Sequence, residues 1–256
     1  MALYNNNITT RITMIYRILP LILFCVLSVK PLYVLENAKN EVTGTDPKLI
    51  AANTKAALIA ESKSFYNLID TNGFTLPTLE SFIAGFEGYE TLKQQGKVTN
   101  EILTIIDFSL SSTQERMWII DMKTQKVILK SLVAHGKNSG LEYATNFSNT
   151  NESFKSSLGF YLSGEAYQGK HGLSLRLDGM EYGINDKARN RAVVIHGADY
   201  VSKSFIKNNG RLGRSQGCPA VPYEIHQELI QIIKDRSCIF IYHPSRAYVA
   251  KSKLVS

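Results

Sequence analysis

After residue 98 the sequence consists of short apolar runs separated by turn-forming residues, and this pattern constrains the fold most. Short runs rich in valine, isoleucine and aromatic side chains are typical of β-strands. Lys123, Thr124 and Gln125 separate two such runs and predict a hairpin. We expect strands at residues 102–108, 117–121, 127–133, 158–162, 173–177, 191–195 and 238–242. The sequence therefore predicts a mainly β fold of the α+β class.

Helical spacing of apolar residues appears in three places outside these runs. One helix is predicted from Asp46-Pro47, a second from about Thr78 to Gly96, and a third from Pro222. The last basic residues, after 245, indicate a solvated tail. These boundaries predict a short helical N-terminal region at residues 39–98 and a mainly β domain with a C-terminal helix at residues 99–256.

The first 35 residues contain no acidic residue, and Arg11 and Arg17 precede an apolar run at residues 18–29. A positive start followed by a short apolar stretch is typical of a secretory signal. Small residues at the spacing of a cleavage site are missing before Ala38. Residues 1–38 therefore form either a signal peptide or a membrane anchor, the latter through residues 12–29. Either way we expect export to the periplasm or cell envelope, because positive residues stay cytoplasmic.

The chain has 256 residues and a net charge of +7. This length allows one sizeable domain or two small ones. No run of five or more basic residues is present, which argues against a nucleic-acid-binding stripe. A basic protein is equally suited to an anionic envelope polymer or a membrane surface. We expect no nucleic-acid partner, and the sequence leaves the oligomeric state open.

The three cysteines have different surroundings. Cys25 lies in the N-terminal apolar run, and Cys238 lies in a strand-like run that suits a small buried side chain. Only Cys218 has glycine and proline as neighbours. Because the three lack short-range pairing, they predict neither a disulfide framework nor a zinc site, and we expect no metal or cofactor. A Cys218–Cys238 disulfide is the structural alternative to a free thiol at Cys218.

The run 191–195 would place His196 at the end of a strand, and residues 215–219 would form a tight loop that carries Cys218. A histidine and a cysteine so placed have the residue types of a thiol nucleophile and its base. A neighbouring imidazolium lowers a cysteine pKa from about 8.5 to between about 3.5 and 7.5. The sequence therefore predicts a cysteine enzyme.

Two further groups would complete such a site. Pro219 has no N–H, so the donors to a tetrahedral oxyanion would come from Cys218 and Gly217. The imidazole also needs an acceptor for its second nitrogen. The carbonyl of Gly197 and the carboxylate of Asp199 are the two local candidates.

His196-Gly197 followed by Ser215-Gln-Gly-Cys218 resembles the signature of the L,D-transpeptidase catalytic domain (YkuD-like) family, in which His-Gly precedes Ser-His-Gly-Cys by a similar interval. The wider chain is similar to the branch described as murein L,D-transpeptidase catalytic domain proteins. The likeness covers roughly residues 99–245 and implies an L,D-transpeptidase-like β-sandwich or barrel. Its motifs are His135-Gly-Lys-Asn-Ser-Gly140, Ser156-Ser-Leu-Gly-Phe-Tyr161, Gly169-Lys-His-Gly172, Asn185-Asp186 and Gly213-Arg-Ser-Gln-Gly-Cys-Pro-Ala220.

The resemblance implies that Cys218 is the nucleophile, His196 the base and the Gly197 carbonyl the orienting group. The implied reaction begins with attack on the L-to-D peptide bond before the terminal D-alanine of a peptidoglycan tetrapeptide stem. The acyl group then passes to an amine of a neighbouring stem, or to water in a carboxypeptidase or endopeptidase. Gln216 stands where the commoner branch has histidine, and Pro219-Ala220 where it has an apolar residue and arginine. Donor and acceptor preference is therefore open.

Polar residues around these motifs are candidates for substrate contacts. Arg214 precedes the nucleophile loop, and arginine suits a carboxylate geometrically. His135 is either a substrate contact or a turn residue before Gly136. The substrate-binding candidates are His135, Ser139, Tyr167, His171, Arg214, Ser215 and Gln216.

Two other functions are compatible with parts of the sequence. His171 and Asp178 are spaced as in some zinc peptidases of the same polymer, with His135 or His196 as a further ligand. That interpretation lacks a His-x-His pair and gives Cys218 no role, and Asp178 is also expected to pair with Arg176 on one strand. The other function is an exported wall-binding protein whose cysteine and histidine are inert.

Overall fold

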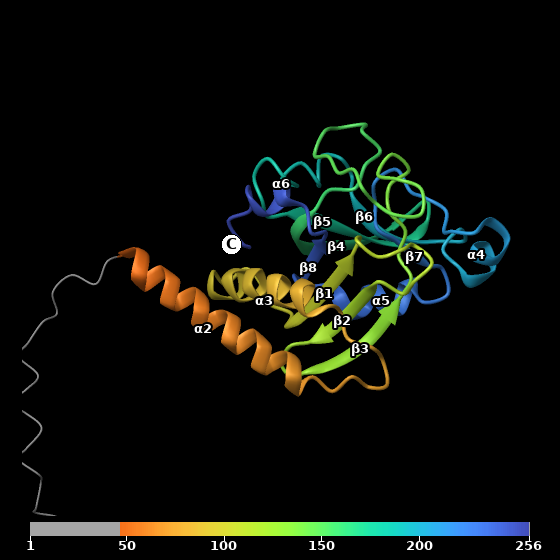
Figure 1. Ribbon diagram of the computed structural model, residues 1–256. Coiled ribbons are helices and arrows are strands. Elements are labelled where there is room, and N and C mark those ends of the chain that lie inside the picture. Colours follow the sequence, from red (N-terminus) through yellow and green to blue (C-terminus); the bar gives the residue numbers. More distant parts are fainter. Residues whose placement is uncertain (1–46, 256) are drawn as a thin grey trace, which may run out of the picture. The chain divides into compact units, whose positions relative to one another are not determined.

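The computed structural model describes residues 47–255, with side chains from residue 52 onward (Figure 1). Contacts divide the chain into two units, residues 1–50 and 51–256, and the sheet belongs to the second. The predicted signal peptide or anchor lies outside the described residues. Within residues 47–255, no helix combines the length and the apolar character needed to cross a bilayer.

Two helices precede the sheet, as predicted: α2 (Pro47–Leu68) and α3 (Leu79–Gln94). The Thr78 side chain caps α3 by accepting a hydrogen bond from the Ser81 N–H at 3.2 Å. Phe65 of α2 stacks on Phe82 of α3 with ring centroids 5.9 Å apart. The apolar stripes of the two helices therefore pack on each other.

One mixed sheet of eight strands forms the body of the second unit (Figure 1). Its strand order is β3-β2-β1-β8-β4-β5-β6-β7, in which only the β1–β8 and β6–β7 pairs are parallel. The strands are β1 (Ile102–Asp107), β2 (Met117–Asp121), β3 (Lys126–Ser131), β4 (Gly159–Gly169), β5 (Gly172–Gly179), β6 (Val194–Ala198), β7 (Ala220–Pro222) and β8 (Cys238–Tyr242). The predicted mainly β, α+β class is confirmed.

The β4–β5 hairpin is longer than the apolar runs indicate. β4 pairs with β8 only at residues 159–162, and beyond this point it pairs with β5 alone. Its outer half carries exposed polar residues such as Glu165 and Gln168. An apolar run marks only the part of a strand that is buried on both faces, so the sequence predicts the inner half and misses the outer one.

Two boundaries near the candidate site differ from the prediction, and two short helices are not predicted. β6 begins at Val194, because Ala192 has φ 53° and the Val193 N–H donates to Ala188 O at 2.9 Å in a turn. Pro222 ends β7, and α5 (His226–Ile233) begins four residues later. Two short helices, α4 (Lys203–Asn209) and α6 (Arg246–Val249), lack a long apolar stripe and are not predicted. Residues 246–249 are thus helical, where the sequence indicates a tail.

Helix α3 lies against β1 and β8 at the centre of the sheet. A Cβ at Gly88 would come within 2.1 Å of Phe160 Cζ, so only glycine allows this approach. Phe160 in turn stacks on Phe240 of β8, with ring centroids 4.2 Å apart. These contacts pack α3 closely against the middle of the sheet.

The last strand pair brings the two halves of the candidate motif together. β6 and β7 are parallel, and His196 is in register with Ala220, two residues after Cys218. A bridge between Gly136 and Ser215 ties the nucleophile loop to the 135–140 segment. The fold thus brings three segments, distant in sequence, to one end of β6.

Candidate active site

His196 is a buried residue of β6 with one defined hydrogen-bond partner. Its side chain is 4% exposed, and Nδ1 lies 3.0 Å from the carbonyl oxygen of Gly197. Because a carbonyl only accepts, Nδ1 carries the proton and Nε2 is left as an acceptor. Burial lowers the pKa of His196. Of the two orienting groups considered, the Gly197 carbonyl makes the contact.

Gly197 has a packing reason to be glycine. An added Cβ would lie 2.8 Å from His226 Cγ and 3.0 Å from Tyr223 Cδ2, so a side chain would push against α5 and the residues before it. The backbone after His196 therefore lies close to His226, which fixes the carbonyl that accepts the hydrogen bond from Nδ1.

The loop that carries Cys218 is bracketed by Ser215. The Ser215 hydroxyl donates to the Cys218 carbonyl at 2.6 Å and accepts from the Gly217 N–H at 3.0 Å. Gly217 has φ +122°, and a Cβ there would lie 2.8 Å from the Lys155 carbonyl oxygen. Gly217 is therefore required by its own backbone and by the approach of the 153–157 segment.

Cys218 is a half-buried free thiol, and Cys238 is buried and free, so no disulfide joins them. The thiol points toward the Ala192 carbonyl oxygen, with Sγ 3.8 Å away. Burial raises the pKa of Cys218, while the Val194 N–H and the positive charge of Arg191 lower it. The resting sulfur is therefore a neutral thiol.

Cys218 and His196 lie on neighbouring segments without a hydrogen bond between them. In the part of the chain that the structure describes, the Cys218 thiol donates to the Ala192 carbonyl and His196 Nδ1 donates to the Gly197 carbonyl. Paired residues of neighbouring strands present their side chains on the same face, so Ala220 faces the same side as His196. The strand register thus places Cys218 two residues from the partner of His196, and no hydrogen bond joins the two side chains.

The backbone donors near the thiol differ from those that the sequence suggests. The Gly217 N–H already donates to Ser215 Oγ. Within residues 52–255, no acceptor is found for the N–H groups of Gln216 and Cys218. The donors that remain free for an oxyanion are thus Cys218 and Gln216 rather than Cys218 and Gly217.

Three of the candidate substrate contacts are buried and bonded within the protein. The His135 side chain is 1% exposed, with Nδ1 2.8 Å from Arg116 Nη2 and Nε2 3.4 Å from the Gly140 carbonyl oxygen. The Ser139 hydroxyl accepts from the Ser156 N–H at 2.9 Å. With Ser215 they support the loops around the thiol and offer no free polar group to a ligand.

The other four candidates reach the surface. Gln216 and His171 are exposed, and the His171 ring stacks on His196 with centroids 4.7 Å apart. Arg214 is half-buried and donates from Nη1 to the carbonyls of Lys137 and Gly140, both at 3.1 Å. The guanidinium of Arg176 lies over the Tyr167 ring, 4.5 Å from the ring centroid. Of these four, only His171 contacts His196 directly.

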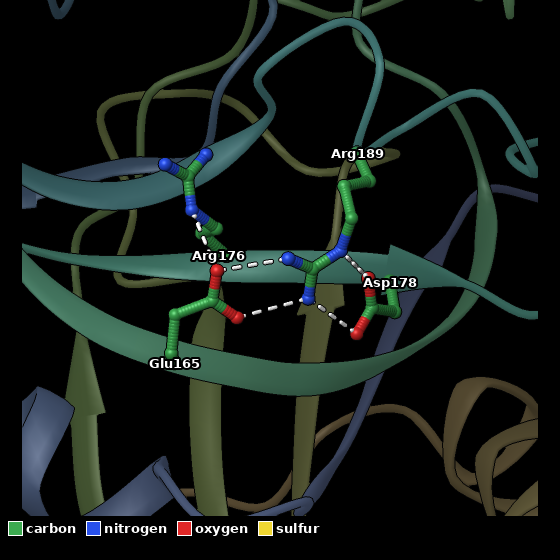
Figure 2. A network of polar contacts seen from close by, with 4 residues as sticks. All are labelled: Glu165, Arg176, Asp178 and Arg189. Carbon is green, nitrogen blue, oxygen red and sulfur yellow. Dashed lines mark hydrogen bonds and ion pairs between the residues drawn. The ribbon is translucent and has the colours of Figure 1, made fainter.

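The residues of the alternative zinc site have other partners in the structure. Figure 2 shows Asp178 bonded by Arg189, which also reaches Glu165 at 2.8 and 3.0 Å. Arg176 pairs with Glu165 at 2.8 Å, so the expected Arg176–Asp178 pair is wrong: the guanidinium of Arg189 takes Asp178 instead. Among the described residues, no group of three or more metal-ligating side chains could hold a metal ion.

Arg191 is the site residue that the sequence does not single out. Its guanidinium reaches residues 148–157 on one side and lies beside the nucleophile loop on the other. The only signal in the sequence is its place at the start of the run that leads to His196.

A family model described as the L,D-transpeptidase catalytic domain matches residues 77–242. The chain belongs to the L,D-transpeptidase catalytic domain family. It therefore carries the catalytic domain of an enzyme, and the match begins just before α3, so it takes in that helix. Comparison with curated proteins gives no match.

Solved structures of L,D-transpeptidases are similar to the chain at low identity. One from Mycobacterium smegmatis is 12% identical with a TM-score of 0.35, covering 56% of this chain and 59% of that one. One from Xylanimonas cellulosilytica is 12% identical with a TM-score of 0.33, covering 73% and 93%. One from Stackebrandtia nassauensis is 9% identical with a TM-score of 0.35, covering 65% and 68%. The chain spans 59% of the length of the first two solved structures that it matches.

Proposed function

We propose that this protein is a cysteine-dependent L,D-transpeptidase that acts on peptidoglycan stem peptides. The observation that carries the proposal is the fixed tautomer of His196, whose free Nε2 lies on the strand beside the Cys218 loop. A neutral imidazole with an open nitrogen is the form that accepts a proton from a thiol. Family membership supplies the class of substrate.

The first half-reaction forms a thioester. The Cys218 thiol turns from the Ala192 carbonyl toward His196 and gives its proton to Nε2 as Sγ attacks the carbonyl carbon of the L-to-D peptide bond. The oxyanion accepts hydrogen bonds from the free N–H groups of Cys218 and Gln216. When the C–N bond breaks, the leaving amine takes the proton from His196, and D-alanine departs.

The second half-reaction restores the thiol. An amine of a neighbouring stem attacks the thioester carbon and gives its proton to His196, which returns it to the departing sulfur. Water in place of the amine gives hydrolysis, the carboxypeptidase or endopeptidase alternative. Both outcomes share the acyl-enzyme and differ in the acceptor that reaches it. Because the substrate is a wall polymer, the proposal includes export to the cell envelope, with residues 1–38 as signal peptide or anchor.

Labelling with a carbapenem tests the nucleophile. We expect imipenem to add one mass equivalent to the protein, to lose this addition in C218A and to retain it in C238A, since Cys238 is fully buried. Labelling that persists in C218A would contradict the proposal, as would activity that a chelator abolishes and C218S retains. Absence of labelling in all three proteins would favour an inert wall-binding protein.

Incubation with purified tetrapeptide muropeptides separates the two outcomes of the acyl-enzyme. Dimers are the expected product of transfer, and tripeptides alone would indicate hydrolysis. If neither product forms while Cys218 still reacts with imipenem, the assignment of stem peptides as the substrate is overturned.

A further inference from the structure

Arg191 has an unusual set of partners for a half-buried arginine. Its Nη1 donates to the Ser148 carbonyl at 2.9 Å and to the Ser157 hydroxyl at 2.8 Å. Its Nη2 donates to the Lys155 carbonyl at 2.6 Å and to the Ser153 hydroxyl at 3.4 Å. All four acceptors are neutral oxygens. Within residues 52–255, no carboxylate lies within ion-pair distance of this guanidinium.

Arg189, two residues earlier, shows the contrast. Its guanidinium lies between the carboxylates of Glu165 and Asp178 at the surface (Figure 2). The charge of Arg189 is therefore neutralised by protein groups, whereas the charge of Arg191 is not. A cation that is partly removed from water and lacks a counter-ion is costly unless an anion forms beside it.

The guanidinium of Arg191 lies against the nucleophile loop. Nη2 lies 3.4 Å from the position of a Cβ on Gly217, and the Lys155 carbonyl that it holds lies 2.8 Å from the same position. The Ser156 hydroxyl donates to the Gly217 carbonyl at 3.0 Å. Arg191 thus holds residues 153–157 in the place where they support the residue before Cys218.

The backbone next to Arg191 also faces the thiol, since the Ala192 carbonyl is the partner of Sγ. The charged and titratable groups that act on Cys218 are Arg191 and, from the segment after β6, Tyr200. Tyr200 is uncharged near neutral pH, because burial raises its pKa to about 12. Arg191 is therefore the permanent cation that acts on a Cys218 thiolate, in addition to the His196 imidazolium that forms when the thiol gives up its proton.

We propose that Arg191 is the positioning residue of the nucleophile: it clamps residues 148–157 under the Cys218 loop and sets its unpaired positive charge beside the sulfur. Charge develops on sulfur whenever the thiol is activated or a thioester breaks down, and a fixed cation stabilises that state. The proposal rests on the assignment of Cys218 as nucleophile, yet it concerns the ionisation of the thiol and not the identity of the acceptor.

The thiol pKa tests the proposal without any cell-wall substrate. It is measured from the pH dependence of Cys218 alkylation by iodoacetamide in wild type, R191Q, R191K and the matched control R189Q. We expect R191Q to raise the thiol pKa by about one unit, which lowers the thiolate fraction about tenfold, and R189Q to leave it unchanged. A wild-type thiol pKa in folded R191Q, or an equal rise in R189Q, overturns the proposal.

If R191Q does not fold, the R191K variant still tests the proposal. Lysine keeps the charge but lacks the planar fork that reaches both hydroxyls and both carbonyls, so we expect a smaller rise of about half a unit. A wild-type thiol pKa in R191K would then overturn the proposal. A protein that fails to cross-link stems but shows these shifts would contradict the proposed function and leave the role of Arg191 standing.

Discussion

At His196 and Cys218, burial moves the two pKa values apart. It lowers the pKa of the imidazole and raises that of the thiol, so both groups are neutral near pH 7. Proton transfer must then accompany attack on the substrate. The positive charge of Arg191 and the free N–H groups act where charge develops, in the transition state rather than in the resting enzyme.

This resting state predicts the pH dependence of acylation. We expect the rate of Cys218 acylation by imipenem to rise through an apparent pKa below 6.5, the ordinary value for histidine, and then to stay level to about pH 8. The imidazole must be neutral to accept the proton, which explains the direction. Rates measured by mass spectrometry across this range check it. A rate that falls across this range would contradict the prediction.

At the scale of the secondary-structure element, the tip of the β4–β5 hairpin covers His196, the proposed base. His171 sits between the two strands and stacks on His196. Burial is the main cause that lowers the pKa of His196, and the charges of His171, His226 and Lys170 lower it further. The outer half of β4 that carries this tip pairs with β5 alone. The hairpin therefore sets the environment of His196 through one exposed side chain.

Removing the His171 side chain should shift the low-pH part of the pH–rate profile for acylation. In H171A we expect the apparent pKa of acylation to rise, because His196 loses a positive neighbour and part of its cover. H243A is the control, since His243 lies beside Phe147 and outside the site. An acid limb that stays in place in H171A, or moves equally in H243A, would show that the hairpin tip does not act on His196.

Across the whole molecule, stability depends on how closely α3 approaches the sheet. Gly88 meets the Phe160 ring with no room for a methyl group, whereas a Cβ on Gly85 would lie 3.2 Å from Ile105 Cδ1 and 3.3 Å from Phe240 Cδ1. The two glycines lie on the same helix and differ only in what they face. They form a matched pair for testing this contact.

We expect G88A to lower the free energy of unfolding by about 1–3 kcal/mol, because an extra methyl forces the core apart. G85A should stay within about 1 kcal/mol of wild type, since alanine favours the helix and the Ile105 and Phe240 contacts need only small shifts. Urea unfolding followed by the fluorescence of Trp118, the single tryptophan and a buried one, measures both. Equal losses in the two variants would contradict the tight contact at Gly88.

Acid sensitivity is a second property of the whole fold, and His135 contributes to it. Burial and the charge of Arg116 lower the pKa of His135 to about 4. Its stabilising contribution is complete above the unfolded pKa and falls as the pH drops toward the folded one, because only the unfolded chain binds the proton. We expect a loss of about 2 kcal/mol between pH 7 and pH 5 from this residue.

H135N isolates this contribution. Asparagine offers an acceptor to Arg116 but does not titrate, so its free energy of unfolding should fall less over the same pH range, by the amount that His135 supplies. The same unfolding measurement at the two pH values checks this. An identical pH dependence in wild type and H135N would rule out His135 as a source of acid sensitivity.

The sequence by itself determined the class of fold, both long helices, the inner part of most strands, and the candidacy of Cys218 and His196. These depend on neighbours in the chain: apolar spacing, a β-branched run before a histidine, and a cysteine between glycine and proline. Local conformational preferences and burial on both faces of a strand leave this kind of signal.

Only the tertiary structure decided which partners those residues have. In it the Gly197 carbonyl, not Asp199, accepts from His196, and the Gly217 N–H donates to Ser215. It also buries His135 against Arg116 and places Arg191 beside the thiol loop. Each of the last two contacts joins segments well separated in the chain, and β7 and the outer half of β4 likewise exist because a neighbouring strand pairs with them. Such contacts depend on how the whole sheet packs, which no single stretch of sequence specifies.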